Sequence, residues 1–161
     1  MSVKIGVSEG IGESQIKELV DYSSSDPLIV KFTHDATRFK NIEAFKKWKT
    51  EKFIYTLSSS KDKLLGIVWF GKKNHPKAEG LPFTFAIRIY KPARGQGLSK
   101  KLMKSAFDKF IKTDLYQSSV KKGFWLLTRK DNEFAIKLYT NFGFKKILTD
   151  KDGYILMILS I

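Results

Sequence analysis

The sequence predicts a single α/β domain built around a mixed sheet. Segments in which apolar and polar residues alternate, typical of strands, are interleaved with segments that carry apolar residues at helical spacing. The chain of 161 residues is 42% hydrophobic and contains 13 Phe, enough for one core without metal or disulfide support. We therefore expect one domain over residues 1–161, an α/β sandwich in which helices cover the sheet.

The amino-terminal half supplies a strand, two helices and a pair of strands. Val3–Val7 alternates weakly as a strand, and Glu13–Tyr22 places its apolar residues on one helical face. Asn41 precedes a stretch of aromatic and lysine residues and is a typical N-cap for a second helix. Phe53–Leu57 and Leu64–Phe70, joined by a polar segment, are predicted to form an antiparallel pair.

The carboxy-terminal half continues the alternation of strand and helix. In Phe83–Tyr90 the odd-numbered residues are all large and apolar, which indicates a strand with one strongly buried face. An amphipathic helix begins near Leu98, and a later strand, Phe124–Thr128, is again followed by a helix. Two last apolar segments, Phe144–Leu148 and Tyr154–Leu159, are predicted to form a closing hairpin with a short polar turn.

A glycine loop joins the strand Phe83–Tyr90 to the helix that follows it. The loop consists of Arg94, Gly95, Gln96, Gly97, Leu98 and Ser99. Its two glycines let backbone N–H groups turn toward a ligand without a Cβ in the way, and the helix start adds a positive dipole end, so phosphate groups are the expected occupants. Lys100 stands where a dinucleotide fingerprint has its third glycine, and a P-loop sequence is absent. An ordinary strand-to-helix turn is the alternative.

A second motif follows the next strand and extends from Asn132 to Phe144. Asn132, Ala135 and Tyr139 lie on one helical face, which suits one elongated ligand. Arg-x-x-Gly-x-Ser followed by Asn-x-x-Ala-x-x-Leu-Tyr-x-x-x-Gly-Phe resembles the acyl-CoA-binding core of the GNAT superfamily of N-acetyltransferases, with Ser99 where the family has Gly or Ala. The alternative is that Asn132 is only a helix cap and Tyr139 an aromatic residue at the core edge.

This resemblance implies a fold and an activity. The fold is a GNAT-type three-layer sandwich with a mixed, mostly antiparallel central sheet whose two central strands splay apart at the cofactor site. The activity is an acetyl-CoA-dependent N-acetyltransferase that moves an acetyl group to a primary amine by direct attack in a ternary complex. Acetyl-CoA is then a co-substrate, and no metal takes part.

The resemblance also implies residue roles. The backbone N–H of Ile87 donates to the developing oxyanion, Ile89 pairs with the pantetheine arm, and Tyr139 is the general acid for the departing thiolate. The residues implied in cofactor binding are Ile87, Ile89, Arg94, Gly95, Gln96, Gly97, Leu98, Ser99, Lys100, Asn132, Ala135 and Tyr139.

The general base is not identified by the resemblance. Phe83 and Leu127 stand at the two positions where relatives carry a catalytic Glu. Four residues in predicted loops are weak candidates, since each is also an ordinary surface residue: Glu79, His75, Asp35 and His34.

The chain is strongly basic. Lys and Arg total 30 against 16 Asp and Glu, a formal net charge of +14, and most of the excess lies in residues 81–161. This balance suits anionic CoA and is a poor match for polyamines, which leaves neutral or anionic amines, whether small molecules, peptides or proteins. Two alternatives are a basic module that binds RNA or the ribosome and a GNAT protein that binds acyl-CoA without catalysis. Nucleic acid is the less favoured partner, and the sequence does not indicate an oligomeric state.

Composition excludes several other classes. Cysteine is absent, which removes thiol nucleophiles, disulfides and thiolate metal sites, and His34 and His75 alone do not make a zinc site. The apolar runs are too short to cross a bilayer, and the amino terminus lacks the apolar segment of a signal peptide. We expect a cytoplasmic protein that does not bind membranes.

Overall fold

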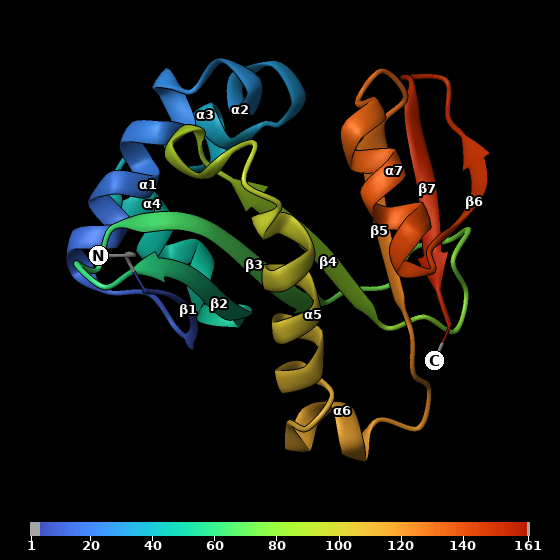
Figure 1. Cartoon of the computed structure of the whole chain (residues 1–161). Helices are drawn as coiled ribbons and strands as arrows, with labels where there is room; N and C mark the ends of the chain where they lie inside the picture. The colour runs from blue at the N-terminus through green and yellow to red at the C-terminus, as the bar shows by residue number, and fades with distance from the viewer. Residues whose placement is uncertain (1–3, 161) are drawn as a thin grey trace. The chain divides into compact units, whose positions relative to one another are not determined.

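The computed structural model describes residues 4–160, which form a seven-stranded mixed sheet with helices packed on it (Figure 1). The order of the strands in the sheet is β1-β2-β3-β4-β5-β7-β6. The strands are β1 (Ile5–Glu9), β2 (Lys52–Ser59), β3 (Leu64–Lys72), β4 (Phe83–Ile89), β5 (Phe124–Arg129), β6 (Lys145–Thr149) and β7 (Tyr154–Leu159).

Seven α-helices and two 3₁₀ segments connect these strands within residues 4–160. They are α1 (Glu13–Ser25), α2 (Pro27–Phe32), α3 (Asp35–Arg38), α4 (Ile42–Trp48), η1 (Lys49–Glu51), η2 (Lys91–Ala93), α5 (Leu98–Phe110), α6 (Asp114–Ser118) and α7 (Glu133–Phe142). The α/β class is confirmed.

The predicted elements are present with small shifts at their ends. The first strand starts later than expected and continues to Glu9, while Val3 lies outside the described residues. Asn41 caps α4 as predicted, because its Oδ1 accepts from the Ala44 N–H at 2.8 Å. The short helices α2, α3 and α6 were not predicted. They span only one or two turns, and a capping side chain begins two of them, Asp26 for α2 and Thr113 for α6.

The described residues fall into two compact units. Unit 1 contains the chain up to Trp69 together with Ile87–Phe110, and unit 2 contains Phe70–Ala86 and the chain from Ile111 onward. Strands β3 and β4 each contribute residues to both units.

In unit 1, helices cover both faces of the sheet (Figure 1). On one face α5 packs so closely that a Cβ on Gly66 would lie 3.1 Å from the Leu102 side chain; it would also lie 2.8 Å from the Arg88 carbonyl oxygen of the adjacent strand β4. Trp69 lies three residues after Gly66 on β3, and because side chains alternate along a strand, it faces the opposite side of the sheet. There its ring lies 4.9 Å from that of Trp48 in α4. Gly66 therefore permits the α5 contact, and the aromatic rings form the other layer.

In unit 2, an aromatic core surrounds the start of β5. Parallel pairing of β4 with β5 consists of two residue pairs, Phe83 with Phe124 and Thr84 with Trp125. β5 then pairs antiparallel with β7, and β7 with β6, which confirms the closing hairpin. Gly143, at φ 124°, ends α7 by donating its N–H to the carbonyl oxygens of the last turn.

Within residues 4–160, no helix combines the length and the apolar character needed to cross a membrane.

Candidate functional site

The glycine loop before α5 has the backbone shape of an anion site. Gly95 and Gly97 adopt φ values of +76° and +69°, a left-handed conformation that favours glycine, and no atom lies within 4 Å of a Cβ built on either. In the described part of the chain, no hydrogen bond uses the backbone N–H of Gly95, Gln96 or Gly97. The loop therefore presents exposed N–H groups with room for a ligand.

Helix α5 strengthens this site. It begins at Leu98 directly after the loop, runs for 13 residues and turns its amino-terminal dipole end toward the glycines. Ser99 is buried at 7% exposure, whereas Lys100 is exposed beside the loop. The Ser99 side chain thus packs inward.

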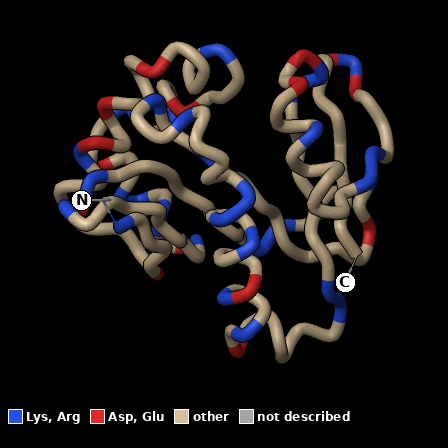
Figure 2. Tube along the Cα trace, in the orientation of Figure 1, with Lys and Arg blue, Asp and Glu red and all other residues tan. Residues whose placement is uncertain are grey.

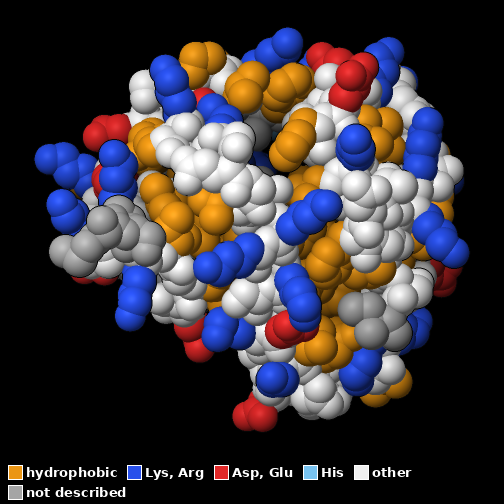
Figure 3. Space-filling model, in the orientation of Figure 1, with side chains coloured by type: hydrophobic (Ala, Val, Ile, Leu, Met, Phe, Trp, Pro, Cys, Tyr) orange, Lys and Arg blue, Asp and Glu red, His pale blue; other side chains and the backbone are white. Residues whose placement is uncertain are grey.

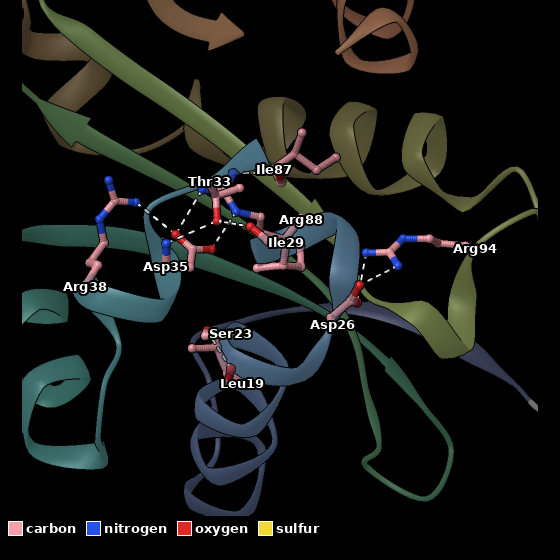
Figure 4. A network of polar contacts seen from close by, with 10 residues as sticks. All are labelled: Leu19, Ser23, Asp26, Ile29, Thr33, Asp35, Arg38, Ile87, Arg88 and Arg94. Atoms are coloured by element: carbon pink, nitrogen blue, oxygen red, sulfur yellow. Dashed lines mark hydrogen bonds and ion pairs between the residues drawn. The ribbon is translucent and has the colours of Figure 1, made fainter. Parts of the chain in front are cut away.

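Arg94 is engaged inside the protein. Its Nη1 and Nη2 donate to the two carboxylate oxygens of Asp26 at 2.6 and 2.8 Å, and its backbone N–H donates to the Lys91 carbonyl (Figure 4). Asp26 is 2% exposed and also accepts the backbone N–H groups of Lys91 and Leu28. These contacts anchor the start of the loop, and the role of Arg94 in cofactor binding stays a prediction.

The backbone N–H groups of Ile87 and Ile89 lie on one edge of β4. Tyr90, just beyond the strand, donates its N–H to the Leu65 carbonyl of β3 at 3.0 Å. Because N–H groups alternate along a strand, those of Ile87 and Ile89 point away from β3. This is the orientation that an oxyanion donor and a pantetheine partner on β4 require.

In unit 2, α7 carries the second motif. Asn132 is the N-cap of α7, and its Oδ1 accepts from the Ala135 N–H at 3.3 Å, so its amide N–H₂ remains the group suited to a ligand carbonyl. Tyr139 is 7% exposed, with its ring 6.1 Å from that of Phe85 and 6.0 Å from that of Phe144. The cap interaction therefore positions the Asn132 side chain, and the aromatic contacts position the Tyr139 side chain, both on α7.

The four weak base candidates have different surroundings. Asp35 is completely buried and its carboxylate is paired with two guanidinium groups, which makes it a poor base. His75 accepts the Lys77 N–H on its Nδ1 within a turn of unit 2, and its ring lies 4.9 Å from that of Trp125. His34 and Glu79 are exposed.

The two positions at which relatives were expected to carry a catalytic Glu hold apolar side chains with different exposure. Phe83 is fully buried in the aromatic core of unit 2, and Leu127 is 44% exposed on β5. Neither supplies a proton acceptor. Within residues 4–160, no group of three or more His, Asp or Glu residues has the spacing to hold a metal ion.

A polar network in unit 1 was not predicted from the sequence (Figure 4). Arg88 donates from Nε and Nη2 to the carboxylate of Asp35 at 2.7 and 3.1 Å, and Arg38 donates from Nη1 at 3.2 Å. Burial lowers the pKa of the Arg38 guanidinium from its ordinary value; Asp35 opposes this shift, while Arg88 adds to it. Arg88 and Asp35 lie 53 residues apart along the chain, so no local pattern marks their pairing, whereas Arg38 is only three residues from Asp35.

A polar hollow of about 650 Å³ lies elsewhere in unit 1, between β1, β2 and the start of α1. Its lining is mostly small and uncharged, and none of the residues predicted to bind the cofactor lines it.

Positive charge is distributed widely. Lys and Arg recur along α5, and on the face seen in the space-filling view they are scattered among hydrophobic and uncharged side chains (Figures 2 and 3).

Solved structures share this fold at low sequence identity. A candidate acetyltransferase from Acinetobacter baylyi is 18% identical with a TM-score of 0.75, over 99% of this chain and 93% of the other. The spermidine N-acetyltransferase of Vibrio cholerae, solved with CoA and spermine, is 14% identical with a TM-score of 0.71, over 98% and 94%. NAA60 of Arabidopsis thaliana, solved with a bisubstrate analogue, is 14% identical with a TM-score of 0.68, over 98% of each chain.

Sequence comparison defines the family. A search of curated proteins finds no match. The profile of the acetyltransferase (GNAT) family, by contrast, matches residues 16–144, a range that includes both the glycine loop and the motif on α7. Since this match covers most of the chain and the solved structures share its fold, the protein belongs to the GNAT acetyltransferase family.

Proposed function

We propose that residues 1–161 form one acetyl-CoA-dependent N-acetyltransferase domain, which transfers an acetyl group to a primary amine by direct attack in a ternary complex. Membership in the GNAT family supports acetyltransferase activity. The observation that carries the proposal is the glycine loop, in which Gly95 and Gly97 have positive φ and N–H groups that bond to nothing else among the described residues, directly before α5.

The two motifs each carry groups whose chemistry suits one part of a ligand with a diphosphate and an amide-bearing arm. The N–H groups of Gly95, Gln96 and Gly97 and the start of α5 would hold the diphosphate, and exposed Lys100 would add positive charge. The free amide N–H₂ of Asn132 would donate to a carbonyl of the pantetheine arm. Acetyl-CoA supplies an acetyl group activated as a thioester.

Two further groups would assist the transfer. The Ile87 N–H, which points away from β3, would donate to the oxyanion that forms on the acetyl carbonyl. The Tyr139 hydroxyl would give its proton to the departing thiolate, and its ring packs edge-on against Phe85 and Phe144. The acceptor amine must lose a proton before attack, and no carboxylate is assigned to take it.

Binding is tested by thermal unfolding with CoA and by calorimetry. A CoA concentration 100 times its Kd should stabilise the fold by about 2.7 kcal/mol. RNA should give little protection, and what it gives should disappear with salt. If RNA protects and CoA does not, the proposed function is wrong and the alternative of a basic RNA-binding module is favoured.

Catalysis is tested with Tyr139→Phe. The variant should lower kcat by about 100-fold or more while the Kd of CoA changes little, because the acid acts only in the transition state. Tyr116→Phe is the matched control, since it removes a hydroxyl from another buried tyrosine of unit 2. An unchanged kcat in Tyr139→Phe would remove this residue from the mechanism.

A further inference from the structure

Two guanidinium groups converge on one carboxylate in unit 1. Asp35 has no exposed surface; Arg88 pairs with both of its oxygens and Arg38 with one of them (Figure 4). We call these three residues the arginine cluster. Since two positive charges face one negative charge, the cluster carries an excess positive charge.

Aromatic rings hold both guanidinium groups in place. The centre of the Arg88 guanidinium lies 4.7 Å from the centroid of the Trp69 ring, and that of Arg38 lies 5.9 Å from it. Trp69 is itself fixed by edge contacts with Trp48 and Phe39. The excess charge is thus preorganised on a rigid aromatic surface.

Arg38 has donors left for a ligand. Its side chain is 36% exposed, and among residues 4–160 the one hydrogen-bond acceptor it contacts is Asp35, through Nη1. A guanidinium has five N–H donors in a planar fork that matches a carboxylate. The outward side of Arg38 therefore presents a fork to an incoming anion.

The cluster reaches the edge of β4 where the oxyanion donor is proposed. Arg88 Nη1 donates to the Ile87 carbonyl oxygen at 3.0 Å. The N–H and C=O of one strand residue point to the same edge, so this carbonyl lies beside the Ile87 N–H. The Ile87 N–H is proposed to donate a hydrogen bond to the acetyl oxygen. A ligand bound to the arginine cluster would therefore lie close to that acetyl group.

Another buried carboxylate of unit 1 is paired with a single arginine. Asp26, equally buried, is balanced by Arg94 alone together with two backbone N–H groups. Adding Arg38 beside Arg88 places two like charges around one carboxylate; water solvates part of this excess at the 36% exposed side chain of Arg38, and an anion bound there would compensate it further.

We propose that the arginine cluster is the acceptor-recognition subsite, and that the acceptor is a primary amine that also carries a carboxylate, which Arg38 binds. This inference rests on the proposed transferase function and names its substrate class. Polyamines, which bring only positive charge, are excluded by the same subsite.

The test measures acetyl transfer to amines in matched pairs that differ in a carboxylate and a carboxamide: glutamate with glutamine, aspartate with asparagine, and glycine with glycinamide. Spermidine is added as a cationic amine. The wild type should prefer the carboxylate member by about 10-fold or more in kcat/KM, and spermidine should be the poorest substrate. The preference should fall to near unity in Arg38→Gln and be partly restored in Arg38→Lys, which keeps the charge but loses the fork.

Lys46→Gln is the control variant. It removes one positive charge from the same unit, and the partner of Lys46 is the exposed Glu13, so the preference should stay at the wild-type level. Because the substrate preference is a ratio within one variant, a general loss of activity does not alter it.

Binding distinguishes the subsite from the transferase function. In the presence of CoA, calorimetry should detect N-acetylglutamate binding to the wild type, with at least a 10-fold loss in Arg38→Gln. If this loss is seen but no amine releases CoA thiol, the subsite stands and the proposed function is wrong. A wild type that acetylates both members of each pair equally, or an Arg38→Gln variant that keeps the preference, would overturn the subsite.

Discussion

Asp26 and Asp35 are two buried carboxylates at the starts of neighbouring short helices, and they are used differently. Asp26 caps α2 and receives one guanidinium, that of Arg94, plus two backbone N–H groups. Asp35 lies in the first turn of α3 and receives two guanidinium groups, those of Arg88 and Arg38. The first arrangement is balanced in charge, whereas the second is not.

The comparison shows that a buried aspartate paired with arginine can have two different roles. The Asp26 pair ties the glycine loop to the junction of α1 and α2, so it fixes a backbone shape. The Asp35 cluster also fixes β4 against α3, but it leaves positive charge at the surface. The balanced pair at Asp26 therefore acts as an anchor, whereas the unbalanced cluster at Asp35 is the one proposed to bind an acceptor.

The largest expected effect belongs to Asp35→Asn. Removing this charge leaves two guanidinium groups close together, and the Arg88 side chain is only 13% exposed, so little water can solvate it. We expect a loss of about 4 kcal/mol in the free energy of unfolding, measured by urea denaturation. Asp108→Asn, in an exposed pair with Lys104, should cost less than about 0.5 kcal/mol. If both variants lost the same unfolding free energy, the buried Asp35 ion pairs would contribute no more to stability than an exposed pair.

A smaller loss is expected for Asp26→Asn, because Arg94 is 25% exposed and water can replace part of its partner. We expect about 3 kcal/mol in unfolding free energy. The Kd of CoA should rise about 10-fold, since the loop loses its anchor, whereas Asp35→Asn should change that Kd by less than about 3-fold. Calorimetry on both variants checks this contrast, which fails if both weaken CoA binding alike.

The smallest effect is expected for Tyr90→Phe. The Tyr90 hydroxyl is fully buried near both carboxylates, without a hydrogen-bond partner among the described residues, and burial raises its pKa well above the ordinary value. Its ring stacks on Tyr22 at 4.7 Å, a contact that Phe keeps. Unfolding should give unchanged stability or a gain of up to about 1 kcal/mol. A clear loss would show that the hydroxyl is hydrogen-bonded in solution and couples the two carboxylates.

Much of the fold could be predicted because its signals are local. The odd-numbered residues of β4 carry the predicted apolar face, and burial of Phe83, Phe85 and Ile87 confirms it. Asn41 and Gly143 mark helix ends by side chains or conformations that act within a few residues. The short helices α2, α3 and α6 escaped prediction because so few residues give no helical periodicity. The pair Asp26-Pro27, a cap followed by proline at the first helical position, was a signal that pointed to α2.

The candidate site divides in the same way. The glycine loop and the motif from Asn132 to Phe144 could be recognised from spacing, since each is continuous in the chain. The role of Arg94 could not, because its partner Asp26 lies 68 residues away. Asp35 is a weak base candidate in the sequence, but in the structure its carboxylate is paired with two arginines. No local sequence pattern distinguishes a free catalytic carboxylate from one that is paired in this way.

The sequence by itself determined the α/β class, the glycine loop before α5, the family resemblance and the absence of cysteine chemistry. The absence of cysteine follows from composition. The other features depend on residues that are neighbours in the chain or that recur at the period of a helix or strand. Only the tertiary structure decided which carboxylate holds which arginine, and that one of them holds two. Charge pairing depends on distances across the fold, where the low polarity of the interior makes each uncompensated charge costly, and the chain order does not encode those distances.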